Sequence, residues 1–217
     1  MENVKNMMYQ QTNRYIYHRF GKRIVDVVVS VSILAIYIPI LVLFSIILFL
    51  FSGGPIFFTQ IRAGLNNTPF TIWKFRTMQP TIEESSSHQY DWEGGVPKDF
   101  SFTKPEHLNI TQLGKIYRKF SIDEIPQLWN VIKGDMSFVG PRPEMLEITK
   151  HYSAEQKSRL LVKPGLTGYA QIQGRSNITH GEKVNHDLYY VQHCSFLLDL
   201  KIILRTILIV ITGKGAY

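Results

Sequence analysis

Two adjacent carboxylates, Asp123 and Glu124, are the residues whose type and setting could do chemistry in this sequence. They follow Arg118 and fall in residues 121–134, whose apolar spacing predicts a helix. Two interpretations are open. Ser121 and Glu124 match a capping box, in which both side chains satisfy free backbone amides at a helix start. A helix start also keeps a carboxylate ionised and receives phosphate oxygens, so the same pair suits catalysis.

Further along the chain, arginines and glycines support a phosphate site. Arg142 stands between two prolines in residues 140–143, which presents its planar guanidinium rigidly to a phosphate or a carboxylate. Residues 163–168 and the pair Gly174 and Arg175 add glycines that let the backbone approach a ligand. Each feature alone is weak, because an isolated Arg or Gly is most often structural. Together they favour a phosphate ligand.

A long uncharged run of residues is the candidate membrane anchor that would hold the carboxylates and cations at the membrane. The 217 residues suffice for about one domain, and the formal charge of +7 indicates an anionic partner. Residues 27–51 carry no charge and are almost entirely hydrophobic, which is typical of a membrane segment. The basic, 26-residue stretch before the run and the lack of a small-x-small site after it argue against a cleaved signal peptide.

How this run meets the bilayer is open between two topologies. As one helix, 25 residues reach about 37 Å, enough to cross a ~30 Å hydrocarbon core. Pro39 lies in the middle and favours a break into two pieces that are each too short to cross. The cations on both flanks agree with a hairpin whose ends return to the same face. A single span with a tolerated proline kink is the alternative.

The rest of the chain is predicted to form one catalytic domain. Residues 56–61 and 70–75 have the pattern of a β-hairpin, and residues of about 80–109 form an acidic insert, interpreted as a mobile surface segment. Residues 196–211 suit a helix lying among lipid headgroups or packing on the domain. The predicted fold class is α+β and mostly helical, with residues 1–52 as the membrane part and 53–217 as a cytosolic domain.

Several other classes of site and partner are disfavoured. Cys194 is the only cysteine, so no intrachain disulfide is possible, and it is interpreted as a small buried residue. The histidines have no metal-ligand spacing, and neither GxxxxGK[ST] nor GxGxxG occurs. The aromatic residues are not interleaved with a basic stripe, which argues against nucleic acid as the anionic partner.

In combination, six ordered motifs resemble the bacterial sugar transferase family, the monotopic phosphoglycosyl transferases. The motifs are KRIVD at 22–26, GPIFFTQIR at 54–62, WKFRTM at 73–78, DEIPQLWNVIKGDMS at 123–137, GPRP at 140–143 and KPGLTGYAQ at 163–171. The resemblance covers about residues 20–215. It implies a re-entrant helix-break-helix with both ends at the cytoplasmic face of the bacterial inner membrane, and interfacial amphipathic helices on the domain.

The resemblance also implies an activity. Sugar 1-phosphate would move from a UDP-sugar to polyprenyl (undecaprenyl) phosphate, with UMP released, as the first step of surface glycan or polysaccharide assembly. Asp123 would be the nucleophile that forms a covalent aspartyl phosphosugar. Glu124 would help Asp123 to hold Mg²⁺, or would deprotonate the lipid phosphate. The implied partners are the UDP-sugar, the polyprenyl phosphate and membrane lipid, and a homodimer is compatible with them.

The resemblance assigns substrate-binding roles to seven cations. One group matches positions that contact phosphate or the uridine nucleotide, and it comprises Arg118, Arg142 and Arg175. Lys22 and Arg23 stand where a lipid phosphate would lie. Lys74 and Arg76, within the WKFRTM motif, complete the predicted set. A catalytically inactive membrane scaffold and a phosphohydrolase are the alternatives, and which sugar is transferred stays open.

Overall fold

The structure is a computed structural model that describes residues 21–78, 92–101, 110–174 and 178–212, together with Tyr17 and Tyr90. Its helices are α2 (Lys22–Ser52), α3 (Gln112–Lys119), α4 (Gln127–Lys133), α5 (Leu146–Thr149), α6 (Ala154–Lys157), α7 (Tyr169–Gln173), α8 (His180–His193) and α9 (Phe196–Thr212). The strands are β1 (Phe57–Ala63), β2 (Pro69–Phe75), β3 (Ser137–Val139) and β4 (Gly165–Thr167), and the 3₁₀ turns are η2 (Leu65–Asn67), η3 (Ile122–Glu124) and η4 (Ser158–Leu161).

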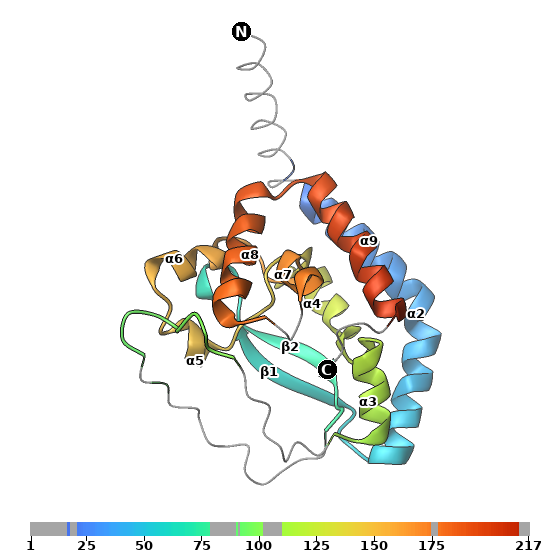
Figure 1. Cartoon of the computed structure of the whole chain (residues 1–217). Coiled ribbons are helices and arrows are strands. Elements are labelled where there is room, and N and C mark those ends of the chain that lie inside the picture. Colours follow the sequence, from blue (N-terminus) through green and yellow to red (C-terminus); the bar gives the residue numbers. More distant parts are fainter. Residues whose placement is uncertain are drawn as a thin grey trace.

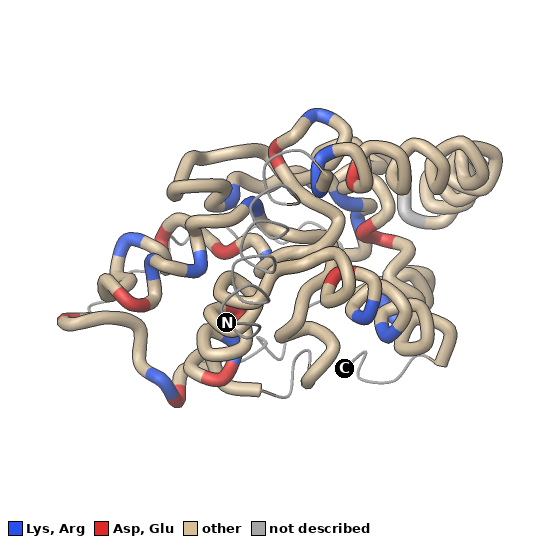
Figure 2. The backbone as a smooth tube through the Cα atoms, turned by 90° about the horizontal axis from the view of Figure 1, so that it is seen from above, with Lys and Arg blue, Asp and Glu red and all other residues tan. Residues whose placement is uncertain are grey.

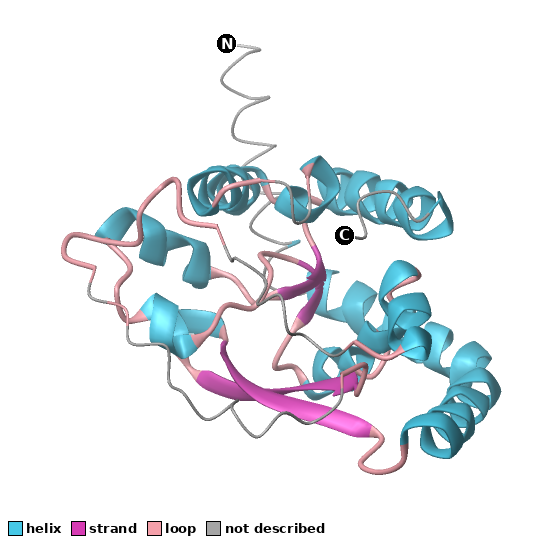
Figure 3. Ribbon diagram, turned by 60° about the horizontal axis from the view of Figure 1, so that its bottom comes forward, coloured by secondary structure: helices cyan, strands magenta, loops and turns pink. Residues whose placement is uncertain are grey.

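The described part of the chain is mostly helical around two small sheets, which confirms the predicted balance of helix and strand. β1 and β2 form the expected antiparallel hairpin, with Phe57 opposite Phe75 and Ala63 opposite Pro69. β3 and β4 form a short parallel pair. Figure 3 shows the hairpin as one layer, with the β3–β4 pair between it and the helices on the other side. The two sheets therefore connect the helices into one body.

The apolar run forms one helix, α2, which continues through Pro39 and so differs from the expected break into two shorter helices. Its length and composition are sufficient to cross a membrane. In Figure 1 the path of α2 bends along its length, as expected where a proline removes a helical hydrogen bond. Figure 2 shows a long helical stretch without charge at one edge of the molecule. Side chains in its middle are exposed, with Ile36 at 69% and Ile38 at 55%.

Both ends of α2 are attached to the same globular domain. At the beginning, the Lys22 ammonium donates a 2.6 Å hydrogen bond to Asp199 of α9, and the Asp26 carboxylate accepts one from the Phe138 backbone N–H in β3. Toward the end, Leu48 is fully buried in a cluster with Phe75 and Tyr117. The helix is thus fastened at its two ends and exposed between them.

The C-terminal helix α9 packs on the domain, which is one of the two alternatives left open by its sequence. Asp199 and Ile202 are buried against the domain, and Ile202 shares a core cluster with Val139 and Cys194. On other sides of the helix, large apolar residues are exposed, with Leu197 at 75% and Ile211 at 70%. The helix packs on the domain through one face and leaves an apolar face uncovered. Cys194 is buried, in agreement with its predicted structural role.

Much of the acidic insert lies outside the described residues. The part that is described, Tyr90 and residues 92–101, packs on the domain. Trp92 and Phe100 contact the core cluster that contains the buried Val96, and the Val96 backbone exchanges two hydrogen bonds with the side chain of Gln156. The prediction of a mobile surface segment is therefore wrong for this stretch. The prediction rests on the charged residues, whereas the aromatic side chains pack into the core.

Candidate active site

The two carboxylates lie in η3, at the junction between α3 and α4. Ser121 has a left-handed backbone, with φ of 55°, and its side chain caps no helix. α4 begins only after Pro126, and a proline is far more favourable at a helix start than in the helix interior. The capping-box interpretation is therefore wrong. Gly134 does end α4, in the left-handed conformation expected for a helix stop.

Glu124 faces two cations. Its Oε1 accepts hydrogen bonds from Lys74 Nζ at 3.2 Å and from Arg142 Nη2 at 2.6 Å, and its Oε2 is 3.4 Å from Arg142 Nη1. Burial alone would raise the pKa of Glu124, but the charges and hydrogen bonds of Arg142 and Lys74 outweigh it and hold the pKa well below its usual range. Glu124 is accordingly ionised throughout the physiological pH range.

Asp123 lies in a different environment although it is the next residue. It is 9% exposed, and within the described residues it has no ion pair within 4 Å. Burial and the neighbouring charge of Glu124 raise the pKa of Asp123 to about 6, against the opposing effect of Lys74 and the two arginines 118 and 142. Two adjacent carboxyls with pKa values displaced in opposite directions are typical of catalytic pairs.

Of the seven predicted substrate-binding cations, three lie beside the carboxylates. Lys74 and Arg142 contact Glu124 directly. Arg118 acts on Asp123 through its charge, and its Nε donates a 2.9 Å hydrogen bond to the hydroxyl of Thr77. β2 supplies Lys74, α3 supplies Arg118, and the loop between β3 and α5 supplies Arg142. Elements distant in sequence thus converge on the pair of adjacent carboxyls, Asp123 and Glu124, called the dyad below.

The other predicted cations have different partners or no description. Arg76 donates hydrogen bonds to the carbonyls of Gly53 and Gly54 at the exit of α2, at 2.8 and 2.9 Å. Lys22 pairs with Asp199. The guanidinium of Arg23 donates to the last carbonyls of α4, an arrangement favoured by the helix dipole. Arg175 lies outside the described residues. The structure therefore brings Lys22, Arg23 and Arg76 into contacts within the protein.

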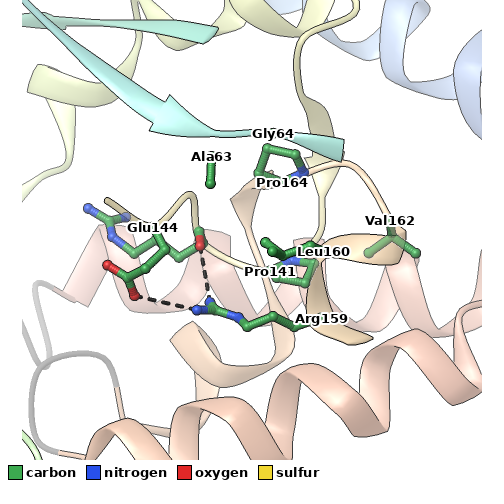
Figure 4. Close-up of a pocket in the computed structure, with 9 residues that line it drawn as sticks. Ala63, Gly64, Pro141, Glu144, Arg159, Leu160, Val162 and Pro164 are labelled. Atoms are coloured by element: carbon green, nitrogen blue, oxygen red, sulfur yellow. Dashed lines mark hydrogen bonds and ion pairs between the residues drawn. The ribbon is translucent and has the colours of Figure 1, made fainter. Parts of the chain in front are cut away.

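A buried arginine that sequence reasoning missed supports the loop of Arg142. Arg159 is 3% exposed, lies 2.6 Å from Asp187 of α8 and 3.4 Å from Glu144, and donates a 3.1 Å hydrogen bond to the carbonyl of Arg142. Figure 4 shows Arg159 and Glu144 beside a small pocket with their contacts dashed. No local pattern distinguishes this arginine, because these partners come from two separate segments, residues 142–144 and α8.

Sequence reasoning missed two further residues. Both of them line a polar hollow next to Glu124. Arg62, at the end of β1, and Gln127, at the start of α4, border this hollow with Lys74 and Arg142. The hairpin register was a usable signal for Arg62, since β1 and β2 pair over their whole length and bring residue 62 to the same sheet as residue 74. Gln127 lay within a quoted motif but had no assigned role.

The dyad offers few of the ligands that a divalent cation would need. Among the described residues, no group of three or more Asp, Glu, His or Cys side chains converges. Mg²⁺ commonly binds through one or two carboxylates, with substrate phosphates and water completing the shell. Asp123 fits that description, whereas Glu124 is already neutralised by two cations. A magnesium ion is therefore compatible with Asp123 together with a phosphate ligand.

Comparison with known proteins decides the family. The sequence model of the family described as bacterial sugar transferase matches residues 17–213. The chain belongs to this family. This bacterial sugar transferase is 40% identical over 195 residues to the sugar transferase EpsL of Bacillus subtilis (strain 168), and the match covers 89% of each chain. The motifs that suggested the resemblance all lie within the matched residues.

Two relatives carry names that state an activity. The UDP-glucose:undecaprenyl-phosphate glucose-1-phosphate transferase of Caulobacter vibrioides is 38% identical over 204 residues, covering 90% of this sugar transferase and 72% of that protein. The UDP-N-acetylgalactosamine-undecaprenyl-phosphate N-acetylgalactosaminephosphotransferase of Aeromonas hydrophila is 33% identical over 211 residues. The chain spans only 45% of the latter's length. The two names share an undecaprenyl phosphate acceptor and differ in the sugar.

Proposed function

We propose that this sugar transferase moves a sugar 1-phosphate from a UDP-sugar to polyprenyl phosphate, releases UMP and so starts the assembly of a surface glycan. The observation that carries the proposal is the pair of adjacent carboxyls, one neutralised by two cations and one with its pKa raised to about 6. The donor and acceptor named for the relatives from Caulobacter and Aeromonas support the substrate class.

In the first step Asp123 is the nucleophile. An oxygen of its carboxylate attacks the sugar-bearing phosphorus of the diphosphate. The bond from that phosphorus to the bridging oxygen breaks, and UMP leaves with this oxygen and the electron pair. The aspartyl phosphosugar remains on the enzyme. Lys74, Arg118 and Arg142 are the cations nearest the dyad, and they would stabilise the charge on the diphosphate as it reacts.

In the second step the polyprenyl phosphate is the nucleophile. One of its oxygens attacks the phosphorus of the aspartyl phosphosugar, the acyl phosphate bond breaks, and the Asp123 carboxylate is regenerated. The product is a polyprenyl diphosphate sugar. Glu124, held ionised by Arg142 and Lys74, keeps both cations in place through both steps. When bound, Mg²⁺ would neutralise further diphosphate charge, and Asp123 is the protein residue that would hold it, because Glu124 already contacts Lys74 and Arg142.

The attachment of both ends of α2 to one domain supports a re-entrant topology at the cytoplasmic face. The domain contacts α2 through Asp26 near its start and Leu48 near its end. A helix that crossed the bilayer once would place these ends on opposite sides, and a domain in contact with both would then have to lie within the hydrocarbon core. The uncovered apolar faces of α2 and α9 would then lie in the membrane, which keeps the dyad near the headgroups.

Thiol labelling tests this topology. In a Cys194→Ser background, single cysteines are introduced by Asn13→Cys, before α2, and Thr59→Cys, on the exposed part of β1. We expect a membrane-impermeant maleimide to label neither variant in intact cells and both in inside-out vesicles. Labelling of one position in intact cells and of the other only in inside-out vesicles would show a single crossing.

The raised pKa of Asp123 predicts an acid limb in the pH profile. Above about pH 6 the carboxylate is ionised and can attack, and below it kcat/KM should fall about ten-fold per pH unit. Glu124→Gln removes the negative neighbour, so the limb of its remaining activity should move to lower pH. Burial raises the pKa of Asp187 to about 6 as well. If the acid limb of kcat/KM persists in Asp187→Asn, Asp187 is not the group that titrates. If the limb disappears in this variant, the assignment to Asp123 is contradicted.

A donor panel tests the overall activity. Purified protein in detergent or nanodiscs, with Mg²⁺, polyprenyl phosphate and each of several UDP-hexoses and UDP-N-acetylhexosamines, should release UMP with at least one donor. The donor that gives UMP identifies the sugar. Absence of UMP with every donor would contradict the proposed function and leave a scaffold role. Release of free sugar phosphate without acceptor would indicate a hydrolase.

A further inference from the structure

A polar hollow lies directly beside Glu124 and has no role in the two steps described above. Its walls come from the β1–β2 hairpin, the start of α4 and the loop after β3. The lining residues are Arg62, Ile72, Lys74, Gln127, Arg142 and Pro143. Lys74 and Arg142 therefore face the hollow while they also contact Glu124.

The hollow carries more positive than negative charge. Three of its six lining residues are cations, and no carboxylate lines it. Arg62 donates to Gln60 Oε1 from Nε at 3.1 Å and from Nη2 at 2.6 Å, and among the described residues it has no ion pair within 4 Å. Burial lowers the pKa of Arg62, against the opposing charge of Glu144 and together with the charge of Arg142. Lys74 and Arg142 already contact Glu124, so an anion in the hollow would above all give Arg62 a charged partner.

Gln127 gives an independent indication of a ligand. Its side chain is 2% exposed, and the amide Nε2 has no hydrogen-bond partner within the described part of the chain. A buried donor left unpaired is unfavourable, and a ligand that supplies the acceptor would remove this cost. Phosphate oxygens accept from amides and guanidinium groups alike.

We propose that this hollow binds the phosphate of the UDP-sugar that departs with UMP, through Arg62 and Gln127 in addition to Lys74 and Arg142. The inference rests on the proposed function. Lys74 and Arg142 are shared with the dyad, so a phosphate held here lies next to the one that Asp123 attacks. Negative charge grows on the departing phosphate in the transition state, and fixed cations there favour its departure.

The position of the hollow favours the nucleotide over the lipid phosphate. None of its lining residues belongs to α2 or α9, the helices with the uncovered apolar faces. A lipid phosphate enters from the membrane and would be met first by residues of those helices. The UDP-sugar arrives from water and does not have to pass those helices.

Binding of UMP to the full-length protein carrying Asp123→Asn tests the inference without turnover. Isothermal titration calorimetry measures the affinity for UMP and for uridine in this protein and in double variants that also carry Arg62→Met or Gln127→Leu. We expect UMP affinity to fall about ten-fold or more in each, as for loss of a charge-assisted hydrogen bond, and uridine affinity to stay unchanged. Lys133→Met is the matched control, because Lys133 is an exposed cation paired with Asp135, and it should leave both affinities unchanged.

Steady-state kinetics of the active enzyme distinguish the source of the phosphate. Arg62→Met and Gln127→Leu should raise KM for the UDP-sugar about ten-fold and leave KM for polyprenyl phosphate unchanged, with Arg62→Lys retaining part of the affinity. A rise only in KM for the lipid would overturn the inference in favour of the acceptor phosphate. Unchanged UMP affinity in Gln127→Leu, which keeps the side-chain size, would overturn it even if Arg62→Met failed to fold. Absence of UMP release by the unmutated enzyme would instead contradict the proposed function.

Discussion

Asp123→Asn should lower UMP release by at least about 10³-fold, because an amide cannot form the acyl phosphate and removal of a nucleophile is among the largest single losses in enzymes. The carboxyl is buried and has no ion pair among the described residues, so the exchange of one oxygen for a nitrogen disturbs little else. UMP formation and intact-protein mass after incubation with UDP-sugar, without lipid acceptor, measure the effect. The unmutated protein should gain the mass of a phosphosugar, and the variant should not.

Asp135→Asn is the matched control for this experiment. Asp135 lies just after α4 and pairs with Lys133 at 3.1 Å, so the same chemical change is made outside the dyad. We expect Asp135→Asn to keep its activity and its mass increase. Normal UMP release by Asp123→Asn would contradict nucleophilic catalysis and favour the scaffold alternative, in which the dyad has only a structural role.

Arg142→Met is expected to reduce kcat/KM by about 10²–10³-fold, the range found when one donor that stabilises a transition state is removed. The loss has two sources. Arg142 is one of the cations that act on Asp123 and is proposed to bind the substrate phosphate, and its removal leaves Lys74 alone with the charge of Glu124. Rates of UMP release with varied UDP-sugar and varied lipid measure both KM values.

Conservative and distant substitutions separate charge from geometry at this position. Arg142→Lys keeps the charge but cannot offer two guanidinium nitrogens to Glu124, as Nη1 and Nη2 now do, so it should recover only part of the rate. Lys150→Met removes an exposed cation at the end of α5 and should have little effect. A full recovery by Arg142→Lys would show that charge alone is required.

Elements with a strong local pattern could be predicted from the sequence. The uncharged run became α2, the alternating residues became the β1–β2 hairpin, and Gly134 ended α4 in a left-handed conformation. The carboxyl pair stood out because adjacent Asp and Glu followed a cation. Hydrophobic period, turn residues and helix-stop glycines act over a few neighbours, which is why these features are readable without contacts.

The predicted capping box does not form, because contacts with distant residues override the local preference of Ser121 and Glu124. Ser121 and Glu124 have the correct spacing, but Glu124 is held by Lys74, 50 residues earlier, and by Arg142, 18 residues later. Its side chain therefore points to these cations and not back to the Ser121 amide. Pro126 moves the start of α4 beyond the pair, and Ser121 adopts the left-handed backbone instead.

The sequence by itself determined the apolar helix, the hairpin, the family and the two carboxylates. Only the tertiary structure decided which carboxyl is neutralised, which cations lie beside the pair and which, like Lys22 and Arg23, have partners within the chain. It also brought Arg62 and Gln127 to one hollow from positions 65 residues apart. The pKa of a carboxyl depends on burial and on charges a few ångströms away. These charges belong to segments far apart in the sequence, and no local sequence pattern shows that the fold brings them together.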